Sequence, residues 1–176
     1  MKEQNIQDFW QENPCGETLI ETVYNEDLSF YDDYDAMRYS SHAHLLKTLD
    51  GIPFQGKKTL EIGIGQGGDA EQIVRRGGLY SGLDLTHEAV RRVKRRFELK
   101  QLSFDTITQG SILEAPFDDN SFDLIFSHGV LHHVPNILQA QKEIARILKP
   151  NGLLVVMLYA RHSLNYHLSI RILRRL

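Results

Sequence analysis

The chain has 176 residues, of which 41% are hydrophobic and 24% are charged, a composition typical of one folded globular domain and not of a disordered chain. Its formal net charge of −3 argues against a nucleic-acid partner, because the molecule as a whole lacks the basic field that binds phosphates. The single cysteine, Cys15, excludes an internal disulfide and a cysteine metal cluster.

The N-terminus reads Met-Lys-Glu-Gln-Asn and leads into no apolar run, which argues against a secretory signal. The sequence also lacks a run of about 18 apolar residues, the length that a membrane-spanning helix needs. We therefore expect a cytoplasmic protein without a membrane span.

Aromatic side chains crowd the first part of the chain, and residues 31–50 are predicted to be helical. We expect residues 1–50 to form an N-terminal segment distinct from a core domain at 51–176. The aromatic face of this segment either packs a helix on the core or forms a lid over a ligand. In the second case, the side chains expected to reach the ligand are Tyr31, Tyr34 and Tyr39.

Strands and helices alternate through the core domain. We expect strands at residues 59–62, 79–85, 104–108, 122–127 and 153–159, and helices at 69–76, 86–100 and 135–149. Such alternation predicts βαβ units, and hence an α/β doubly wound, mostly parallel sheet covered on both faces. Ligands of such sheets bind beyond the carboxyl ends of the strands, so the loops that follow the strands are the candidate sites.

The helix expected at residues 86–100 is strongly basic. Its apolar residues share one face, which predicts that this face packs on the sheet. We interpret the basic residues as a solvated surface of the helix, and they are Arg91, Arg92, Lys94, Arg95, Arg96 and Lys100.

A glycine-rich loop joins the first strand to the helix that follows it. The loop reads Glu-Ile-Gly-Ile-Gly-Gln-Gly-Gly-Asp at residues 61–69, in which Gly63, Gly65 and Gly68 match the G-x-G-x-x-G fingerprint of dinucleotide-binding turns. Ordinary strand-to-helix turns also carry such glycines. Glu61 favours a different ligand, because a carboxylate just before the loop suits ammonium and sulfonium groups better than a pyrophosphate.

Asp84 stands at the end of the second strand, 19 positions after Gly65 (84 − 65). A carboxylate at this place in a nucleotide-binding fold accepts hydrogen bonds from both hydroxyls of a ribose. The alternative is a surface aspartate that precedes a helix N-cap. Together, Glu61 and Asp84 indicate a ligand with both a cationic group and a ribose.

Four motifs in order resemble those of class I S-adenosylmethionine-dependent methyltransferases, over residues 57–159. Residues 61–67 are similar to the E/D-x-G-x-G-x-G motif, and residues 82–86 are similar to the second motif. Residues 111–134 resemble the third and fourth motif region of the small-molecule branch, the methyltransferase type 11 domain of ubiquinone and menaquinone biosynthesis. The turn Leu-Lys-Pro-Asn-Gly at 148–152 is similar to the L-K-P-G-G turn of the family.

The resemblance implies a Rossmann-like enzyme that transfers a methyl group from S-adenosyl-L-methionine to an unidentified small-molecule acceptor. The family often has aspartate where this chain has Ser111, the position that meets the adenine amino group. A serine hydroxyl can accept the same bond without a charge. The residues that the resemblance places against the cofactor are Glu61, Gly63, Ile64, Gly65, Gly67, Asp84, Leu85, Ser111, Ile112 and His128.

Three histidines follow the fourth strand. His128 stands where the resemblance places the methyl group, and a histidine there can act as a general base toward an incoming hydroxyl, amine or acidic carbon. Contact with substrate or cofactor and a structural role are the alternatives. His132 and His133 resemble a paired histidine of this branch, for which we expect packing or capping. His128 and His132 have the spacing of helical zinc ligands, but a third ligand is not evident, so no metal is expected.

Two other functions stay open. One is a cofactor-binding or partner-binding domain without turnover, and the other is an NAD-dependent oxidoreductase, which predicts an apolar residue in place of Glu61.

The resembled fold has two strands after the fifth, whereas 17 residues (176 − 159) follow Tyr159. We therefore expect a core that lacks the last two strands, as a fragment or shortened product, and self-association through strand 153–159 or a helix at 164–176.

Overall fold

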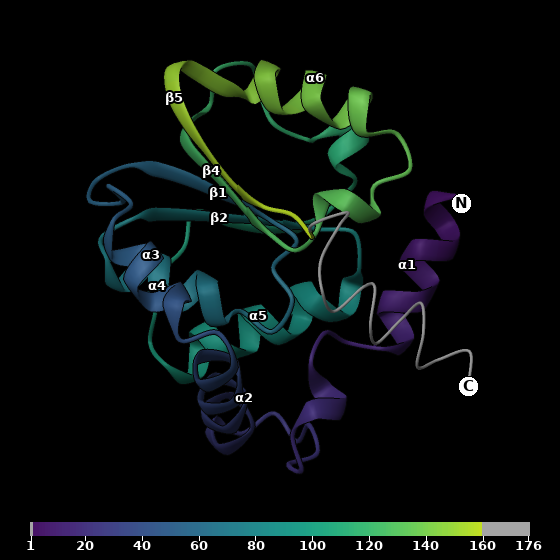
Figure 1. Cartoon of the computed structure of the whole chain (residues 1–176), viewed down its shortest axis with the longest axis vertical. Coiled ribbons are helices and arrows are strands. Elements are labelled where there is room, and N and C mark those ends of the chain that lie inside the picture. Colours follow the sequence, from purple (N-terminus) through teal and green to yellow (C-terminus); the bar gives the residue numbers. More distant parts are fainter. Residues whose placement is uncertain (1, 160–176) are drawn as a thin grey trace.

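A five-stranded sheet runs through residues 2–159, the part of the chain that the computed structural model describes (Figure 1). Its strands are β1 (Lys58–Ile62), β2 (Leu79–Asp84), β3 (Thr106–Gln109), β4 (Phe122–His128) and β5 (Leu148–Met157). They lie in the order β3-β2-β1-β4-β5, and every neighbouring pair is parallel. The connections change direction between β1 and β4, which is the switch point where doubly wound sheets bind ligands.

Helices cover both faces of the sheet, and a separate apolar cluster forms on each face. On one face lie α3 (His44–Asp50), α4 (Gly68–Arg75) and α5 (His87–Leu99), and on the other lies α6 (Ile137–Ile147) (Figure 1). Successive residues of β4 serve opposite faces, since Leu124 packs in the first cluster and Ile125 in the second. This arrangement confirms the α/β doubly wound sheet expected from the sequence.

The N-terminal segment contains three elements before α3. They are α1 (Glu3–Glu12), the 3₁₀ turn η1 (Glu17–Leu19) and α2 (Leu28–Ser41). The single helix predicted over residues 31–50 is wrong, because the chain leaves helical geometry at His42, where φ is −125° and ψ is 53°. The break separates α2, whose buried aromatic residues lie near α5, from α3, whose leucines enter the core of the sheet.

Two strand boundaries also differ from the prediction. The strand expected from residue 104 begins at Thr106, because Phe104 packs edge-on against Phe97 of α5, with ring centroids 5.6 Å apart, before the ladder starts. The strand expected from residue 153 begins at Leu148, which pairs with Phe122 ahead of an irregularity in the ladder. The apolar Phe104 indicates a packed residue, and the turn motif at 148–152 indicates a break between helix and strand. Neither feature shows at which residue the strand pairing begins.

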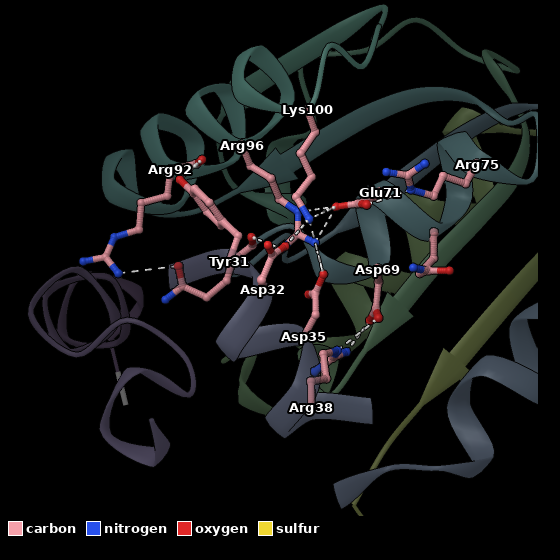
Figure 2. Close-up of polar contacts among 12 residues, drawn as sticks. Tyr31, Asp32, Asp35, Arg38, Asp69, Glu71, Arg75, Arg92, Arg96 and Lys100 are labelled. Atoms are coloured by element: carbon pink, nitrogen blue, oxygen red, sulfur yellow. Dashed lines mark hydrogen bonds and ion pairs between the residues drawn. The ribbon is translucent and has the colours of Figure 1, made fainter. Parts of the chain in front are cut away.

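The basic residues of α5 are only in part a solvated surface, because Lys94 is exposed whereas Arg92 and Arg96, which the prediction also placed there, are buried. Arg92 and Arg96 are 6% and 0% exposed, and they bind carboxylates from α4 and from the N-terminal segment, of which Figure 2 shows those at Arg96. Arg96 donates to Glu71 of α4 over 2.6 Å and also pairs with Asp35 of α2. A buried guanidinium needs such partners, because an unpaired charge away from water is very costly.

Lys100 extends the same network at the end of α5. Its ammonium lies 2.9 Å from Asp32 of α2 and 3.2 Å from Glu71 of α4. Burial alone would raise the pKa of Glu71, but Arg96, Arg75 and Lys100 together lower it to about 2. The network therefore holds α2 against α4 and α5 with charges that persist at neutral pH.

No helix among residues 2–159 is both long enough and apolar enough to cross a membrane.

β5 forms one edge of the described sheet. Leu154 and Val156 of this strand are 40% and 41% exposed, and Leu158, just after its end at Met157, is 51% exposed. An edge strand presents unpaired backbone groups that can template pairing with another chain. The expected alternative contact through a helix at 164–176 lies outside the described residues.

We propose that the β5 edge pairs with a second copy of the chain, and we expect Leu154→Lys to weaken that association. A charge on the edge strand disfavours pairing because it must be desolvated in the contact. Light scattering over a range of concentrations should give a mass above that of one chain for the wild type and a lower mass for the variant. Leu138→Lys, on the exposed side of α6, is the matched control. A wild type that stays monomeric at all concentrations would exclude this contact.

Candidate functional site

A cavity opens at the carboxyl ends of β1, β2 and β4, beside the start of α4, and the N-terminal segment closes part of its wall. Of the cofactor contacts expected from the sequence, Gly67 and Ser111 lie outside the lining and the other eight lie within it. The residues that carry its chemistry are Glu61, Gly63, Ile64, Gly65, Asp69, Asp84, Leu85, Ile112 and His128 from the core, and Glu3, Trp10, Cys15, Tyr34 and Arg38 from the N-terminal segment.

The glycine loop has the geometry that its composition predicts. Gly63 has a φ of +78°, its N–H donates to the carbonyl of Leu83 over 2.8 Å, and a Cβ there would collide with the side chain of Val130. Gly67 also has a positive φ, at the N-cap of α4, and it faces Val93 and Arg96 of α5 instead of the cavity. Gly63 therefore allows the loop to pass against Val130 in the cavity wall, whereas Gly67 allows α4 and α5 to approach.

The carboxylate of Asp84 is held against the glycine loop. Its Oδ2 accepts the N–H of Ile64 over 2.9 Å, and its Oδ1 accepts the N–H and the hydroxyl of Thr86 over 2.9 and 2.8 Å. Burial raises the pKa of Asp84, while these hydrogen bonds from Thr86 and Ile64 favour the charged form. The donors orient both oxygens at the rim of the cavity, where neutral hydroxyl groups of a ligand can reach them.

Glu61 presents a second carboxyl group at the end of the neighbouring strand. It is 2% exposed, and the hydroxyl of Tyr80 donates to its Oε2 over 2.6 Å. Burial raises the pKa of Glu61 well above its ordinary value, and the charge of Asp69 raises it further. A cationic group that entered the cavity would reverse both effects, because it would stabilise the ionised carboxylate.

Arg38 of α2 reaches the cavity and connects α4 with β4. Its Nε donates to Oδ1 of Asp69 over 3.1 Å, and its Nη2 contacts Oδ2 of the same carboxylate. The same Nη2 lies 3.2 Å from Nδ1 of His128. Burial opposes the charge of Arg38, but Asp69 raises its pKa, so the guanidinium stays charged at the centre of this cluster.

Ser111 is occupied by protein contacts and not directed at the cavity. Its hydroxyl accepts the N–H of Leu113 over 2.9 Å, which caps the 3₁₀ turn η2 (Ile112–Glu114). The same hydroxyl donates to Oε1 of Glu3 over 2.5 Å. Ile112 and Glu3 line the cavity, so the region expected to hold an adenine combines an apolar side chain with a carboxylate from α1.

The three tyrosines of the expected lid lie in different places. Tyr34 lines the cavity. Tyr31 is buried between α2 and α5, where its hydroxyl donates to the carbonyl of Arg92 over 2.8 Å. The hydroxyl of Tyr39 lies against Gly68 at the start of α4, outside the lining. Tyr31 and Tyr39 thus pack the N-terminal segment onto the core, which is the other role that the sequence left open.

His132 and His133 belong to an aromatic group at one side of the cavity. Their rings lie 4.1 Å apart between centroids, His132 lies 4.2 Å from Tyr159, and His133 meets Trp10 of α1 edge-on at 5.5 Å. Burial lowers the pKa of both histidines, and His133 lowers that of His132 further. Within residues 2–159, no group of three or more histidine, cysteine, aspartate or glutamate side chains is placed to hold a metal ion.

Sequence reasoning missed the cavity residues that come from outside the motifs. Glu3, Trp10 and Arg38 lie on helices of the N-terminal segment, and Asp69 lies in the first turn of α4. Asp69 carried a sequence signal because it ends the glycine loop, and Trp10 belongs to the aromatic residues from which a lid or a packed helix was expected. Glu3 and Arg38 carried no signal, because they are far in sequence from the residues that they meet and helical spacing alone does not show which residues face a ligand.

A family model described as a methyltransferase domain matches residues 60–156. The phthiotriol/phenolphthiotriol dimycocerosates methyltransferase of Mycobacterium tuberculosis is 30% identical over 139 residues, which cover 76% of this chain and 50% of that protein. The fatty-acid O-methyltransferase of Mycolicibacterium smegmatis is 35% identical over 100 residues, which cover 56% of this chain and 35% of that protein.

Among solved structures, the YcgJ protein of Bacillus subtilis superposes with a TM-score of 0.59 and 28% identity, covering 67% of this chain and 50% of that chain. The chain spans about half the length of the phthiotriol relative and less of the fatty-acid relative. Since the family model matches more than half of its residues, the chain belongs to the methyltransferase domain family.

Proposed function

We propose that this chain binds S-adenosyl-L-methionine in the cavity and takes part in methyl transfer to a small-molecule acceptor. The observation that carries the proposal is the placement of two carboxyl groups, those of Glu61 and Asp84, at the ends of neighbouring strands beside the glycine loop. Asp84 suits the hydroxyls of a ribose, and Glu61 suits an ammonium group. The relatives are named for dimycocerosates and fatty acids, which supports a small-molecule acceptor.

When bound, the cofactor supplies a methyl group attached to a sulfonium sulfur. The sulfur is the leaving group, and it becomes a neutral thioether. With so good a leaving group, the main contribution of the protein is alignment, and orientation can provide as much as about 7–11 kcal/mol of the barrier. In this chain the glycine loop and Asp84 would hold the nucleoside. Gly63 allows close approach beside Val130, and the end of β4 at His128 faces the same space.

The N-terminal segment would serve as a lid over this site, with residues 1–50 closing the core at 51–176. α1 and the loop after it contribute Trp10 and Cys15 to the wall, and α2 contributes Tyr34 and Arg38. Walls of this kind exclude water from the reacting atoms. The tyrosine ring also offers a face to a cation, which contributes roughly 0.5–2 kcal/mol in such contacts.

Glu3 would accept the hydrogen bond from the adenine amino group that Ser111 was expected to accept. The hydroxyl of Ser111 already donates to Oε1 of Glu3, so the carboxylate is held in place with lone pairs left over. Glu3 lies in the same lining as Ile112, whose side chain would pack on the purine ring. A carboxylate from α1 would thus replace the aspartate that the resembled family often carries after the third strand.

A binding domain without turnover is the second candidate, because the two carboxyl groups that carry the first proposal account for cofactor binding alone. Both candidates share the same cofactor site. They differ in whether incubation with labelled S-adenosyl-L-methionine gives a methylated acceptor. An NAD-dependent reaction fits less well, because the buried carboxyl of Glu61 would face a pyrophosphate.

We expect isothermal titration calorimetry to show binding of S-adenosyl-L-homocysteine and S-adenosyl-L-methionine and no binding of NAD. The physical reason is that Glu61 suits the ammonium group of the sulfur nucleosides and would lie against the pyrophosphate of NAD, whereas Asp84 suits a ribose of either ligand. Binding of NAD that is tighter than binding of the two sulfur nucleosides would overturn the proposed cofactor.

We expect Asp84→Ala to lower the affinity for S-adenosyl-L-homocysteine at least tenfold. Hydrogen bonds to a charged partner contribute about 1.5–3 kcal/mol each, and the variant loses two acceptors for hydroxyls. Asp84→Asn should also lower affinity, because both carboxylate oxygens accept N–H donors, and an amide NH₂ would face one of them. Asp105→Ala, on an exposed residue ahead of β3, is the calorimetric control, and equal affinities for all four proteins would mean that the ribose lies elsewhere.

We expect Glu3→Ala to lower the affinity for S-adenosyl-L-homocysteine severalfold, because the adenine amino group loses its acceptor. The loss should be smaller when S-inosyl-L-homocysteine, which lacks that amino group, is titrated instead. Glu12→Ala, on an exposed residue of the same helix, controls for changes in the charge of α1. An equal loss for the two nucleosides would show that Glu3 acts through the fold and not through the adenine.

A further inference from the structure

His128 is held in place by its neighbours on three sides. Its ring is parallel to that of Phe126, at 6.3 Å between centroids and 7° between planes, and it meets the ring of His42 edge-on at 6.3 Å. On the third side, Nη2 of Arg38 lies 3.2 Å from Nδ1. The half-buried ring therefore has one nitrogen occupied by the protein, and the residue contributes to the cavity lining.

The contact with Arg38 determines which nitrogen of His128 carries a proton. A guanidinium has only N–H donors and cannot accept a hydrogen bond. The Nδ1 atom that receives this donor must therefore be unprotonated. A neutral imidazole has one proton, so that proton sits on Nε2.

Arg38 itself has little freedom to release this contact. Two of its nitrogens are engaged by the carboxylate of Asp69, in the fork geometry that gives the strongest charge-assisted pairs. Asp69 lies in the first turn of α4 and is 4% exposed. The second hydrogen of Nη2 remains for Nδ1 of His128, so a single guanidinium serves both partners.

We infer that Arg38 is a positioning residue that holds His128 in the neutral Nε2–H tautomer, so that His128 offers the cavity a hydrogen-bond donor and not a general base. The inference rests on the proposed function only where it concerns the acceptor. The tautomer itself depends on the two side chains alone.

The charges around His128 agree with a neutral ring. Burial lowers the pKa of His128, and Arg38, His42 and His44 lower it further, whereas Asp69 opposes them. These four residues come from α2, the turn after it, α3 and α4, the elements whose titratable groups act on the ring. Below its pKa the ring would carry a second proton on Nδ1, and that proton would oppose the N–H of Arg38.

A donor at this place changes the chemistry expected of the site. Nε2–H can orient a lone pair of an acceptor oxygen or nitrogen, but it cannot remove a proton from that atom. The acceptor would then arrive already nucleophilic, or would lose its proton to another group. This role corresponds to the contact with substrate or cofactor that the sequence left open for His128 beside a general base. The sequence places His128 but does not show which group contacts its Nδ1.

The test is the ¹⁵N NMR spectrum of the full chain labelled at histidine, with long-range ¹H–¹⁵N correlations that distinguish the two ring nitrogens. At pH 7 we expect the His128 signals of the Nε2–H tautomer, with a titration midpoint below the ordinary histidine value of about 6.5. His128→Gln identifies the signals by their absence. A wild-type spectrum with the proton on Nδ1, or with both nitrogens protonated at pH 7, would overturn the inference.

Arg38→Met combined with Asp69→Asn tests the cause of the tautomer. The pair is changed together because a buried carboxylate without its guanidinium would destabilise the fold. We expect the proton to redistribute between Nδ1 and Nε2 of His128, while Arg91→Gln, at an exposed pair on α5, leaves the wild-type spectrum. An unchanged tautomer in the double variant would show that Arg38 does not select it. If the double variant does not fold, the wild-type spectrum still decides the tautomer, and the calorimetry described above tests the cofactor separately.

Discussion

The arrangement of the site depends on one buried cation, Arg96 of α5. Its side chain is 0% exposed, and it binds Glu71 of α4 and Asp35 of α2 while Nη1 donates to the carbonyl of Gln66 in the glycine loop over 3.3 Å. Loss of one partner would leave a buried charge uncompensated, which typically costs about 3–5 kcal/mol, so the charges stay paired only while these elements stay together. The same guanidinium therefore contacts both the glycine loop and α2, the helix that carries Arg38 to the cavity, and Figure 2 shows Asp35 and Arg38 on this helix.

The parts of the fold that follow from short-range pattern could be predicted from the sequence. The alternation of apolar strands with amphipathic helices predicts the parallel sheet, and the glycines and Asp84 mark the carboxyl ends where the cavity lies. Positive φ at Gly63 and the bonds from Ile64 to Asp84 are local requirements of that turn. Such features depend on neighbours along the chain or on the pairing of two adjacent strands. They therefore leave a recognisable pattern in the sequence.

The rest of the site could not be predicted, because it depends on contacts between distant segments. Glu3 meets Ser111 across 108 positions, and Arg38 meets His128 across 90. The basic residues of α5 show the same limit, since composition alone favours a solvated face and only the packed carboxylates of α2 and α4 explain Arg96. The tertiary contacts of a charged side chain thus decide whether it is exposed to solvent, pairs with another residue inside the fold or contacts a ligand.

The balance of charge in the cavity follows from these pairings. Arg38 and Arg92 reach the lining, but each is bound by carboxylates, Asp69 for the first and Glu88 and Glu17 for the second. The carboxyl groups of Glu61 and Asp84 receive hydrogen bonds from neutral donors, Tyr80 in one case and Ile64 and Thr86 in the other. A neutral His128 adds no positive charge. The described cations are thus compensated, whereas Glu61 and Asp84 have no cationic partner in the lining. A sulfonium or an ammonium that entered the cavity would supply that partner and stabilise the ionised form of Glu61, which a pyrophosphate could not do.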